Sequence, residues 1–195
     1  LEAFVDALEV GRAHLVGHSM GAALALAAAA ARPERVASLT LIGGFACCDL
    51  PTIADLAAAV AELQDAVDPE FALAFQESAI HHMIPQRFLE AAVRESLRCP
   101  PHVWRSALRG WIEAQALAAA RVCQAPVLLM RGEHDRLAPA EHQIMLRDAL
   151  ASARVLSVPG AGHAPHWERP EAVAAMLCAF VCEIEEPAIA YSAFA

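Results

Sequence analysis

Short apolar runs alternate along this chain with longer stretches in which apolar residues recur at helical spacing. The runs predict strands at residues 14–16, 36–42, 125–131 and 154–158. The stretches predict helices at residues 1–10, 21–31, 139–150 and 170–183. Strands that alternate with helices are typical of an α/β protein with a mostly parallel sheet and helices on both of its faces. We therefore expect that architecture.

The longest stretch without a strand signal covers residues 47–120. It predicts helices near residues 52–67, 69–79, 85–97 and 101–120. Asp68 is suited to the N-cap of the second of these helices, and Pro69, Pro85 and Pro101 are suited to first turns. Inserted between two strands, the helices would form a cap over one end of the sheet, where ligands bind in open α/β folds. We expect a core at residues 1–46 and 121–186, a cap at 47–120 and a frayed tail at 187–195.

Composition narrows the class of protein. Of 195 residues, 57% are hydrophobic and 19% are charged, which suits one packed domain rather than a disordered chain. The net charge is −9, and all 14 basic residues are scattered arginines, so we expect no nucleic-acid partner. The longest uninterrupted apolar run, residues 21–31, is too short to cross a bilayer, and no membrane association is expected.

The cysteines argue against a metal site. None of the six cysteines forms a C-x-x-C pair, and no His/Cys spacing resembles a zinc site. Cys178 and Cys182 lie four residues apart on an apolar helix and are expected to be buried. We predict no metal and a reducing, cytoplasmic location. The chain begins at Leu1, inside an expected helix, so we expect the sequence to be truncated at its N-terminus.

The strongest local motif is Gly17-His18-Ser19-Met20-Gly21, which follows a predicted strand and precedes a predicted helix. A G-x-S-x-G sequence in that context is typical of a nucleophile elbow. The sharp turn strains the backbone of the serine and exposes its hydroxyl, and glycine at both ends of the motif is expected to allow the close passage of neighbouring backbone. Ser19 is thus a candidate nucleophile, and the Met20 N–H is a candidate oxyanion donor.

A serine hydroxyl needs a general base, and the base needs an orienting acid. Asp135 directly follows a predicted strand, and His163 lies in a glycine-rich loop after the last strand. Loops after the carboxyl ends of parallel strands meet at one edge of the sheet, so these residues can converge on Ser19. Asp49, after the second strand, is an alternative acid. For His166 we expect a packing role, and we expect the His18 side chain to point away from the Ser19 hydroxyl.

Three motifs together resemble the α/β-hydrolase superfamily. They are Gly17-His18-Ser19-Met20-Gly21, Gly132-Glu133-His134-Asp135, and Gly162-His163 followed by Trp167-Glu168-Arg169-Pro170. The resemblance covers residues 1–181 and is closest to the capped, cofactor-free group of esterases, enol-lactonases, C–C hydrolases and haloperoxidase-like enzymes. It implies Ser19 as nucleophile, Asp135 as acid, His163 as base and no cofactor. Serine rather than aspartate at the elbow argues against the haloalkane dehalogenase and epoxide hydrolase relatives.

The resemblance also implies missing parts. Members of the superfamily normally carry further strands before the first helix found here, and a loop among them supplies a second oxyanion donor. Loss of one such donor costs on the order of 10²–10³ in turnover. The strand at residues 14–16 would lack a neighbour and expose an apolar edge. We therefore expect the 195-residue chain by itself to fold poorly or to be inactive, and the full-length protein to be a serine hydrolase.

The motifs favour acyl transfer to Ser19 from a small carboxylic ester or lactone. Open alternatives are C–C bond hydrolysis or haloperoxidase-type chemistry on the same triad, and a non-enzymatic, ligand-sensing role. The expected partner is a small-molecule substrate, and the sequence leaves the oligomeric state open. The walls of the pocket are expected to include large side chains after the second strand and from the cap, namely Phe45, Phe75, Met83, Trp104 and Trp111.

Overall fold

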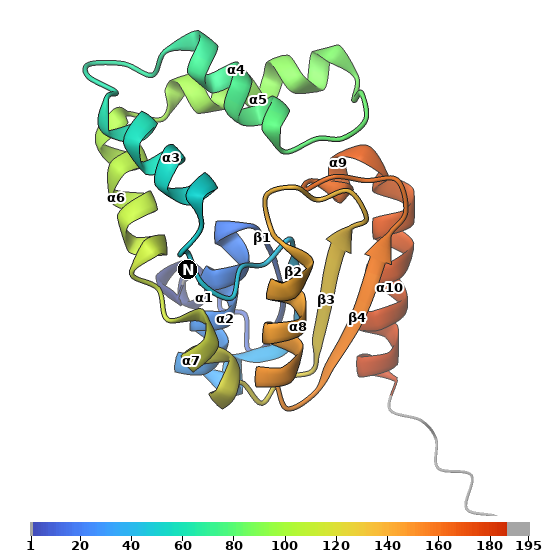
Figure 1. Cartoon of the computed structure of the whole chain (residues 1–195). Helices are drawn as coiled ribbons and strands as arrows, with labels where there is room; N and C mark the ends of the chain where they lie inside the picture. Colours follow the sequence, from blue (N-terminus) through green and yellow to red (C-terminus); the bar gives the residue numbers. More distant parts are fainter. Residues whose placement is uncertain (1, 187–195) are drawn as a thin grey trace, which may run out of the picture.

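The computed structural model describes residues 2–186 and contains a four-stranded parallel sheet in the order β1-β2-β3-β4 (Figure 1). The strands are β1 (Ala13–His18), β2 (Val36–Ile42), β3 (Val127–Gly132) and β4 (Ala153–Val158). Every residue of β2 is buried, whereas β1 and β4 at the edges are partly exposed. The predicted α/β architecture is therefore confirmed, and the most continuous apolar run forms a central strand, as parallel sheets require.

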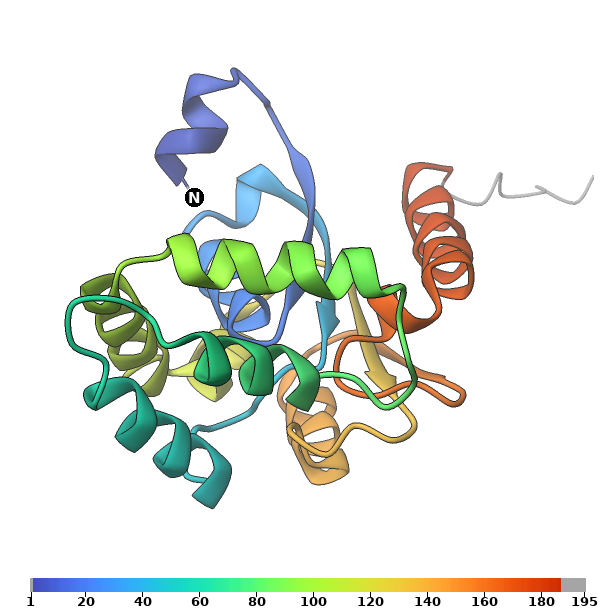
Figure 2. The same cartoon turned by 90° about the horizontal axis from the view of Figure 1, so that it is seen from above.

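Helices cover both faces of the sheet (Figures 1 and 2). One face carries α2 (Met20–Ala31), α7 (Ala116–Val122) and α8 (Ala140–Ala149), and the other carries α10 (Pro170–Glu185). Along β2, Leu39 and Leu41 pack toward the first face, whereas Ile42 packs with Phe180 of α10 on the second. Successive strand residues point to opposite faces, so β2 contributes to both halves of the core.

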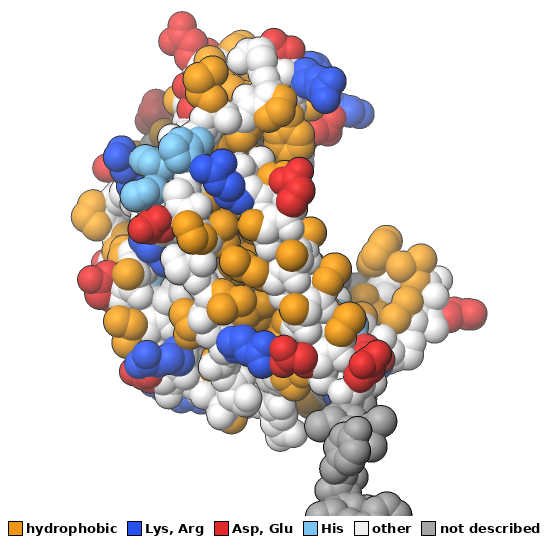
Figure 3. Space-filling view, turned by 90° about the vertical axis from the view of Figure 1, so that its right-hand side faces the viewer, with side chains coloured by type: hydrophobic (Ala, Val, Ile, Leu, Met, Phe, Trp, Pro, Cys, Tyr) orange, Lys and Arg blue, Asp and Glu red, His pale blue; other side chains and the backbone are white. Residues whose placement is uncertain are grey.

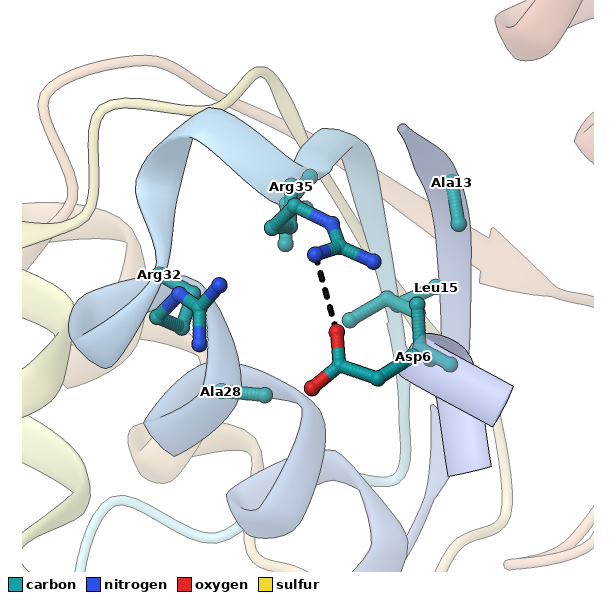
Figure 4. Close-up of a pocket in the computed structure, with 8 residues that line it drawn as sticks. Asp6, Ala13, Leu15, Ala28, Arg32 and Arg35 are labelled. Atoms are coloured by element: carbon teal, nitrogen blue, oxygen red, sulfur yellow. Dashed lines mark ion pairs between the residues drawn. The ribbon is translucent and has the colours of Figure 1, made fainter. Parts of the chain in front are cut away.

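Helix α1 (Glu2–Ala7) lies beside β1 at the edge of the sheet. Asp6 of α1 pairs with Arg35 Nη1 at 2.9 Å, and Arg35 Nη2 also donates to the Val10 carbonyl at 2.8 Å. The ion pair lines a small cavity of about 30 Å³ (Figure 4). A space of this size holds water but no organic ligand. It belongs to the packing of the N-terminal segment.

A helical insertion of four helices separates β2 from β3. It consists of α3 (Pro51–Ala61), α4 (Pro69–Ser78), α5 (Gln86–Arg98) and α6 (Pro101–Ile112). Asp68 caps α4 as expected, because its Oδ1 accepts the N–H groups of Glu70 at 2.8 Å and Phe71 at 3.0 Å. The insertion lies beyond the carboxyl ends of the strands, above the sheet in Figure 1. Val60, Ala72 and Trp111 of the insertion pack in one cluster with Ala23 and Phe45 of the core, so the insertion is joined to the core by apolar contacts.

Several element boundaries differ from the prediction. The helix predicted at 101–120 is two helices, α6 and α7, because the chain turns at residues 113–115. Trp111 packs in the cluster between the insertion and the core, whereas Ala120 packs against the sheet, and one straight helix could not serve both clusters. The helix predicted at 52–67 ends at Ala61, and the short helix α9 (Pro165–Glu168) has no counterpart in the prediction.

The surface shows a further correction. Cys178 and Cys182 are exposed, because their shared face of α10 points away from the sheet. Hydrophobic side chains are spread across the side of the molecule seen in Figure 3. Within residues 2–186, no helix is both long and apolar enough to cross a membrane. The predicted tail at 187–195 lies outside the described residues.

Candidate active site

Ser19 occupies a strained turn between β1 and α2. Its backbone has φ 54° and ψ −120°, a conformation that non-glycine residues seldom adopt. The Ser19 N–H donates to the Ile42 carbonyl at 2.8 Å, which fixes the turn against the end of β2. A Cβ at Gly17 would overlap the Gly21 carbonyl, whereas a Cβ at Gly21 would meet no atom within 4 Å. The expected need for glycine thus holds at position 17 but not at position 21.

Asp135 and His163 form a buried hydrogen-bonded pair at the same edge of the sheet. His163 Nδ1 lies 2.9 Å from Asp135 Oδ2, and the two side chains are 4% and 0% exposed. The other carboxylate oxygen accepts the N–H groups of Leu137 and Ala138, each at 2.9 Å. An ionised carboxylate only accepts hydrogen bonds, so Nδ1 carries the proton and Nε2 is left free as a base.

The surroundings of Asp135 keep its carboxyl ionised. Burial by itself would raise the pKa of Asp135, but the hydrogen bond and charge of His163 and the N–H donors of Ala138 and Leu137 outweigh burial and lower the pKa. A negative charge therefore faces the imidazole. It both selects the tautomer and stabilises the imidazolium that forms when His163 accepts a proton.

Gly43, directly after β2, provides the space for the imidazole. A Cβ at this position would lie 2.8 Å from His163 Cε1 and 2.9 Å from Nδ1, closer than real side chains approach. Gly43 has φ +55°, and its N–H donates to the Met130 carbonyl at 2.9 Å. Glycine is required here for its conformation as well as for its lack of a side chain.

Ser19 and His163 line one cavity of about 480 Å³ that lies between the sheet and the helical insertion. The walls are mostly apolar, and four of the five expected wall residues contribute to them, namely Phe45, Phe75, Trp104 and Trp111. Met83 does not, since its side chain is 98% exposed. It lies in the loop between α4 and α5, where the backbone of the preceding residues faces the core and Met83 projects into solvent.

Comparison with known families identifies this arrangement. Residues 1–170 match the model of a family described as the alpha/beta hydrolase fold. The chain belongs to the alpha/beta hydrolase family. The match begins at residue 1 and includes Ser19, Asp135 and His163.

Curated relatives of this alpha/beta hydrolase are mostly hydrolases. The chain is 28% identical to a 2-hydroxymuconate semialdehyde hydrolase from Pseudomonas sp. (strain CF600), over 95% of this chain and 67% of the relative. It is 31% identical to the dihydrolipoyllysine-residue acetyltransferase component of an acetoin cleaving system from Pseudomonas putida, over 92% and 48%. It is 30% identical to a mouse monoglyceride lipase, over 84% and 55%. The chain thus spans about half to two thirds of the length of these relatives.

Solved structures share the fold of this alpha/beta hydrolase. An esterase from Exiguobacterium antarcticum superimposes with a TM-score of 0.83 at 16% identity, over 93% of this chain and 70% of that one. A meta-cleavage product hydrolase from Pseudomonas fluorescens IP01 superimposes with a TM-score of 0.76 at 21% identity, over 92% and 68%. Identities this low establish the common fold and no particular substrate.

His18 binds the backbone of His163, the candidate base, in a contact that the sequence did not reveal. His18 Nε2 lies 2.8 Å from the His163 carbonyl oxygen. Because a carbonyl only accepts, Nε2 carries the hydrogen and donates a hydrogen bond to it. The His18 ring packs 4.8 Å from the ring of His163 and 4.6 Å from that of His166. Burial, together with the charges of His163 and His166, lowers the pKa of His18 to about 3. His18 is therefore a neutral hydrogen-bond donor to the backbone of His163.

The remaining candidates do not join this group. Asp49, the alternative acid, makes no side-chain hydrogen bond within the described part of the chain, and His163 pairs with Asp135. The His166 ring packs against His18, and its Nδ1 is buried without a hydrogen-bond partner in residues 2–186. In the same residues, no three His, Cys, Asp or Glu side chains are grouped closely enough to hold a metal ion.

Proposed function

We propose that this alpha/beta hydrolase cleaves small carboxylic esters or lactones through an acyl-enzyme on Ser19. One observation supports the proposal above all others. The buried Asp135–His163 pair and the strained Ser19 turn meet at one cavity of about 480 Å³, which is the size of a small-molecule site. The insertion acts as a cap that closes this cavity from above.

In the proposed reaction, His163 Nε2 takes the proton of the Ser19 hydroxyl as Oγ attacks the carbonyl carbon. Asp135 stabilises the resulting imidazolium. The imidazolium then protonates the leaving alcohol, and His163 next activates the water that releases the acid. Within the described residues, Ser19 Oγ makes no hydrogen bond, and contacts of this kind often tighten only when substrate binds.

Met20 is the proposed donor to the oxyanion. It begins α2, so its N–H has no acceptor within its own helix. The N–H belongs to the residue directly after the nucleophile, which is the residue that supplies an oxyanion donor in a nucleophile elbow. A donor in this position contributes about 10²–10³ to turnover in serine hydrolases.

The cavity favours an uncharged, apolar acyl group. Its walls are mostly aliphatic and aromatic side chains from both the core and the insertion, and within residues 2–186 none of the lining residues is Lys or Arg. A carboxylate placed against such walls would lose its hydration without gaining a counter-charge. Neutral acyl groups of medium size avoid that cost.

C–C bond hydrolysis on the same residues is the second candidate. Two relatives matched over most of this chain carry the names of such enzymes, 2-hydroxymuconate semialdehyde hydrolase and 2-hydroxy-6-oxo-6-phenylhexa-2,4-dienoate hydrolase. The names describe anionic substrates. The uncharged walls of this cavity therefore favour ester hydrolysis over C–C hydrolysis.

Chromogenic p-nitrophenyl esters from acetate to octanoate test the proposal. We expect a burst of p-nitrophenol, a preference for medium chains, and a loss of about 10⁴-fold or more in kcat for Ser19→Ala. The exposed Ser106→Ala is the matched control and should retain activity. Ester hydrolysis unaffected by Ser19→Ala would refute the mechanism. Faster turnover of the phenylhexadienoate than of any ester would favour the second candidate.

A further inference from the structure

The carboxylate of Glu168 lies between the candidate base and the helical insertion. It is the last residue of α9, it is 9% exposed, and it accepts hydrogen bonds from backbone on both sides. Oε1 accepts the N–H of Gly162 at 2.7 Å. Oε2 accepts the N–H groups of His81 at 2.9 Å and His82 at 2.6 Å. One buried side chain thus joins two loops that lie more than 80 residues apart.

These hydrogen bonds are strong for their type. A carboxylate that accepts backbone N–H groups forms charge-assisted hydrogen bonds, which are about twice as strong as neutral ones. Burial removes competing water and raises the cost of leaving a donor unpaired. Because three donors share one side chain, the loss of Glu168 would leave all three N–H groups without their acceptor at once.

Two further contacts hold the same two loops together. The Ala164 N–H donates to the Ala79 carbonyl at 2.8 Å. Phe88 of α5 packs against Trp167 at 5.4 Å between ring centroids. The α4–α5 loop therefore rests on the segment that follows His163, and Glu168 lies at the centre of this junction.

Both sides of the junction reach the cavity. His163 and Trp167 line it from the core, and Ser78 and Ala79 line it from the insertion. Gly162, which Glu168 holds directly, precedes His163 in the chain. A shift of the Gly162 backbone would move the imidazole, and a shift of the α4–α5 loop would move one wall of the cavity.

We propose that Glu168 is a positioning residue that anchors the helical insertion to the loop of the base, and so sets both the placement of the His163 imidazole and the width of the cavity. The inference depends on the proposed hydrolase function for its kinetic consequences but not for its structural ones. Glu168 is not among the described residues that line the cavity, so it acts through the backbone groups that it binds.

Glu168→Gln is the informative substitution, because glutamine keeps the size of the side chain while it replaces one acceptor oxygen with an NH₂ donor. The NH₂ group of the glutamine would then face a backbone N–H at one side of the junction, so that two hydrogen-bond donors would meet without an acceptor. Glu171→Gln is the matched control, since it removes the same charge from an exposed site three residues away. Both variants are made in the full 195-residue chain.

Amide hydrogen exchange measures the anchoring without any substrate. We expect the amides of Gly162, His81 and His82 to exchange about 10- to 100-fold faster in Glu168→Gln than in the wild type, as the loss of a charge-assisted hydrogen bond implies. Glu171→Gln should match the wild type. Unchanged exchange at all three amides in Glu168→Gln would overturn the inference, whether or not the chain hydrolyses esters.

Ester kinetics measure the positioning. The amplitude of the p-nitrophenol burst counts active sites, so a merely structural defect would lower the amplitude and leave KM and kcat per active site unchanged. For Glu168→Gln we expect kcat per active site to fall about 10- to 100-fold, and KM to change most for the longest acyl chains. If kcat and KM per active site equal those of Glu171→Gln, Glu168 does not position the base. The sequence predicts that the 195-residue chain by itself is inactive, so a wild-type chain without ester hydrolysis would remove only the kinetic readout. Hydrogen exchange would still decide whether Glu168 anchors the two loops.

Discussion

The partly buried, neutral His18 predicts a specific sensitivity of this fold to acid. Its pKa falls from 6.5 in an exposed setting to about 3 in the folded chain, through burial first and the charges of His163 and His166 next. The unfolded chain therefore binds more protons between pH 6.5 and pH 3, and the free energy of unfolding decreases as the pH falls through that range. Since one pKa unit corresponds to about 1.36 kcal/mol, His18 alone lowers stability by about 2 kcal/mol at pH 5 relative to pH 7.

The assay compares urea unfolding of the wild type and His18→Gln at pH 7 and pH 5, followed by tryptophan fluorescence. Glutamine keeps an N–H donor for the His163 carbonyl but does not titrate. The other titrating groups are common to both proteins and largely cancel in the comparison. We expect the wild type to lose about 2 kcal/mol more than the variant between the two pH values.

The exposed His102→Gln is the control for this comparison and should behave as the wild type does. Equal pH dependence of His18→Gln and wild type would refute the reasoning, because it would mean that His18 either is not buried as a neutral donor or titrates normally in the folded chain.

Three further predictions concern the site and the edge of the sheet. Asp135→Asn should lower kcat for p-nitrophenyl esters by about 10⁴-fold, whereas Asp49→Asn should change it by less than about twofold; the opposite ranking would make Asp49 the acid. Gly43→Ala should lower the free energy of unfolding by about 1–3 kcal/mol in urea titrations, because the φ of residue 43 is +55° and the added Cβ would meet the imidazole. The same substitution should lower kcat by at least about tenfold. Full activity would show that the imidazole does not need this space. Val16 is 49% exposed on the edge strand β1, so Val16→Lys should reduce concentration-dependent association in light scattering. Ile144 on α8 is equally exposed, so Ile144→Lys is the control. If both substitutions reduce association equally, the edge of β1 is not the site of association. The expectation that the 195-residue chain folds poorly or is inactive stays a prediction, which the same light-scattering and ester assays would decide.

The sheet and its candidate catalytic edge were predictable because both depend on local patterns. The apolar run at residues 36–42 predicts a strand, and the structure places it at the centre of the sheet. In a parallel sheet all strands end at one edge, so residues that follow strands meet there whatever their separation in the chain. That rule alone brings Ser19, Asp135 and His163 into one neighbourhood.

Other features depend on packing that no local pattern records. The turn at residues 113–115 contains neither Gly nor Pro, and the helix ends there because Trp111 and Ala120 belong to different clusters. Met83 looks like a wall residue by its type, but the direction of a side chain in a loop follows from where the loop backbone is bound. The exposed face of α10 is apolar, so hydropathy could not show that Cys178 and Cys182 point outward.

The contacts that hold His163 illustrate the same limit most clearly. Asp135 binds the side chain of His163, His18 binds its carbonyl, and Glu168 binds the amide of the preceding Gly162. The first contact joins two recognisable side chains and was therefore predictable from motifs. The other two end on backbone groups, which every residue possesses, so the sequence shows an acceptor or a donor but not its partner. The one available signal for Glu168 is its place in the Trp167-Glu168-Arg169-Pro170 segment close after His163. A carboxylate there that must be buried has to find N–H donors, and the two nearest loops supply them.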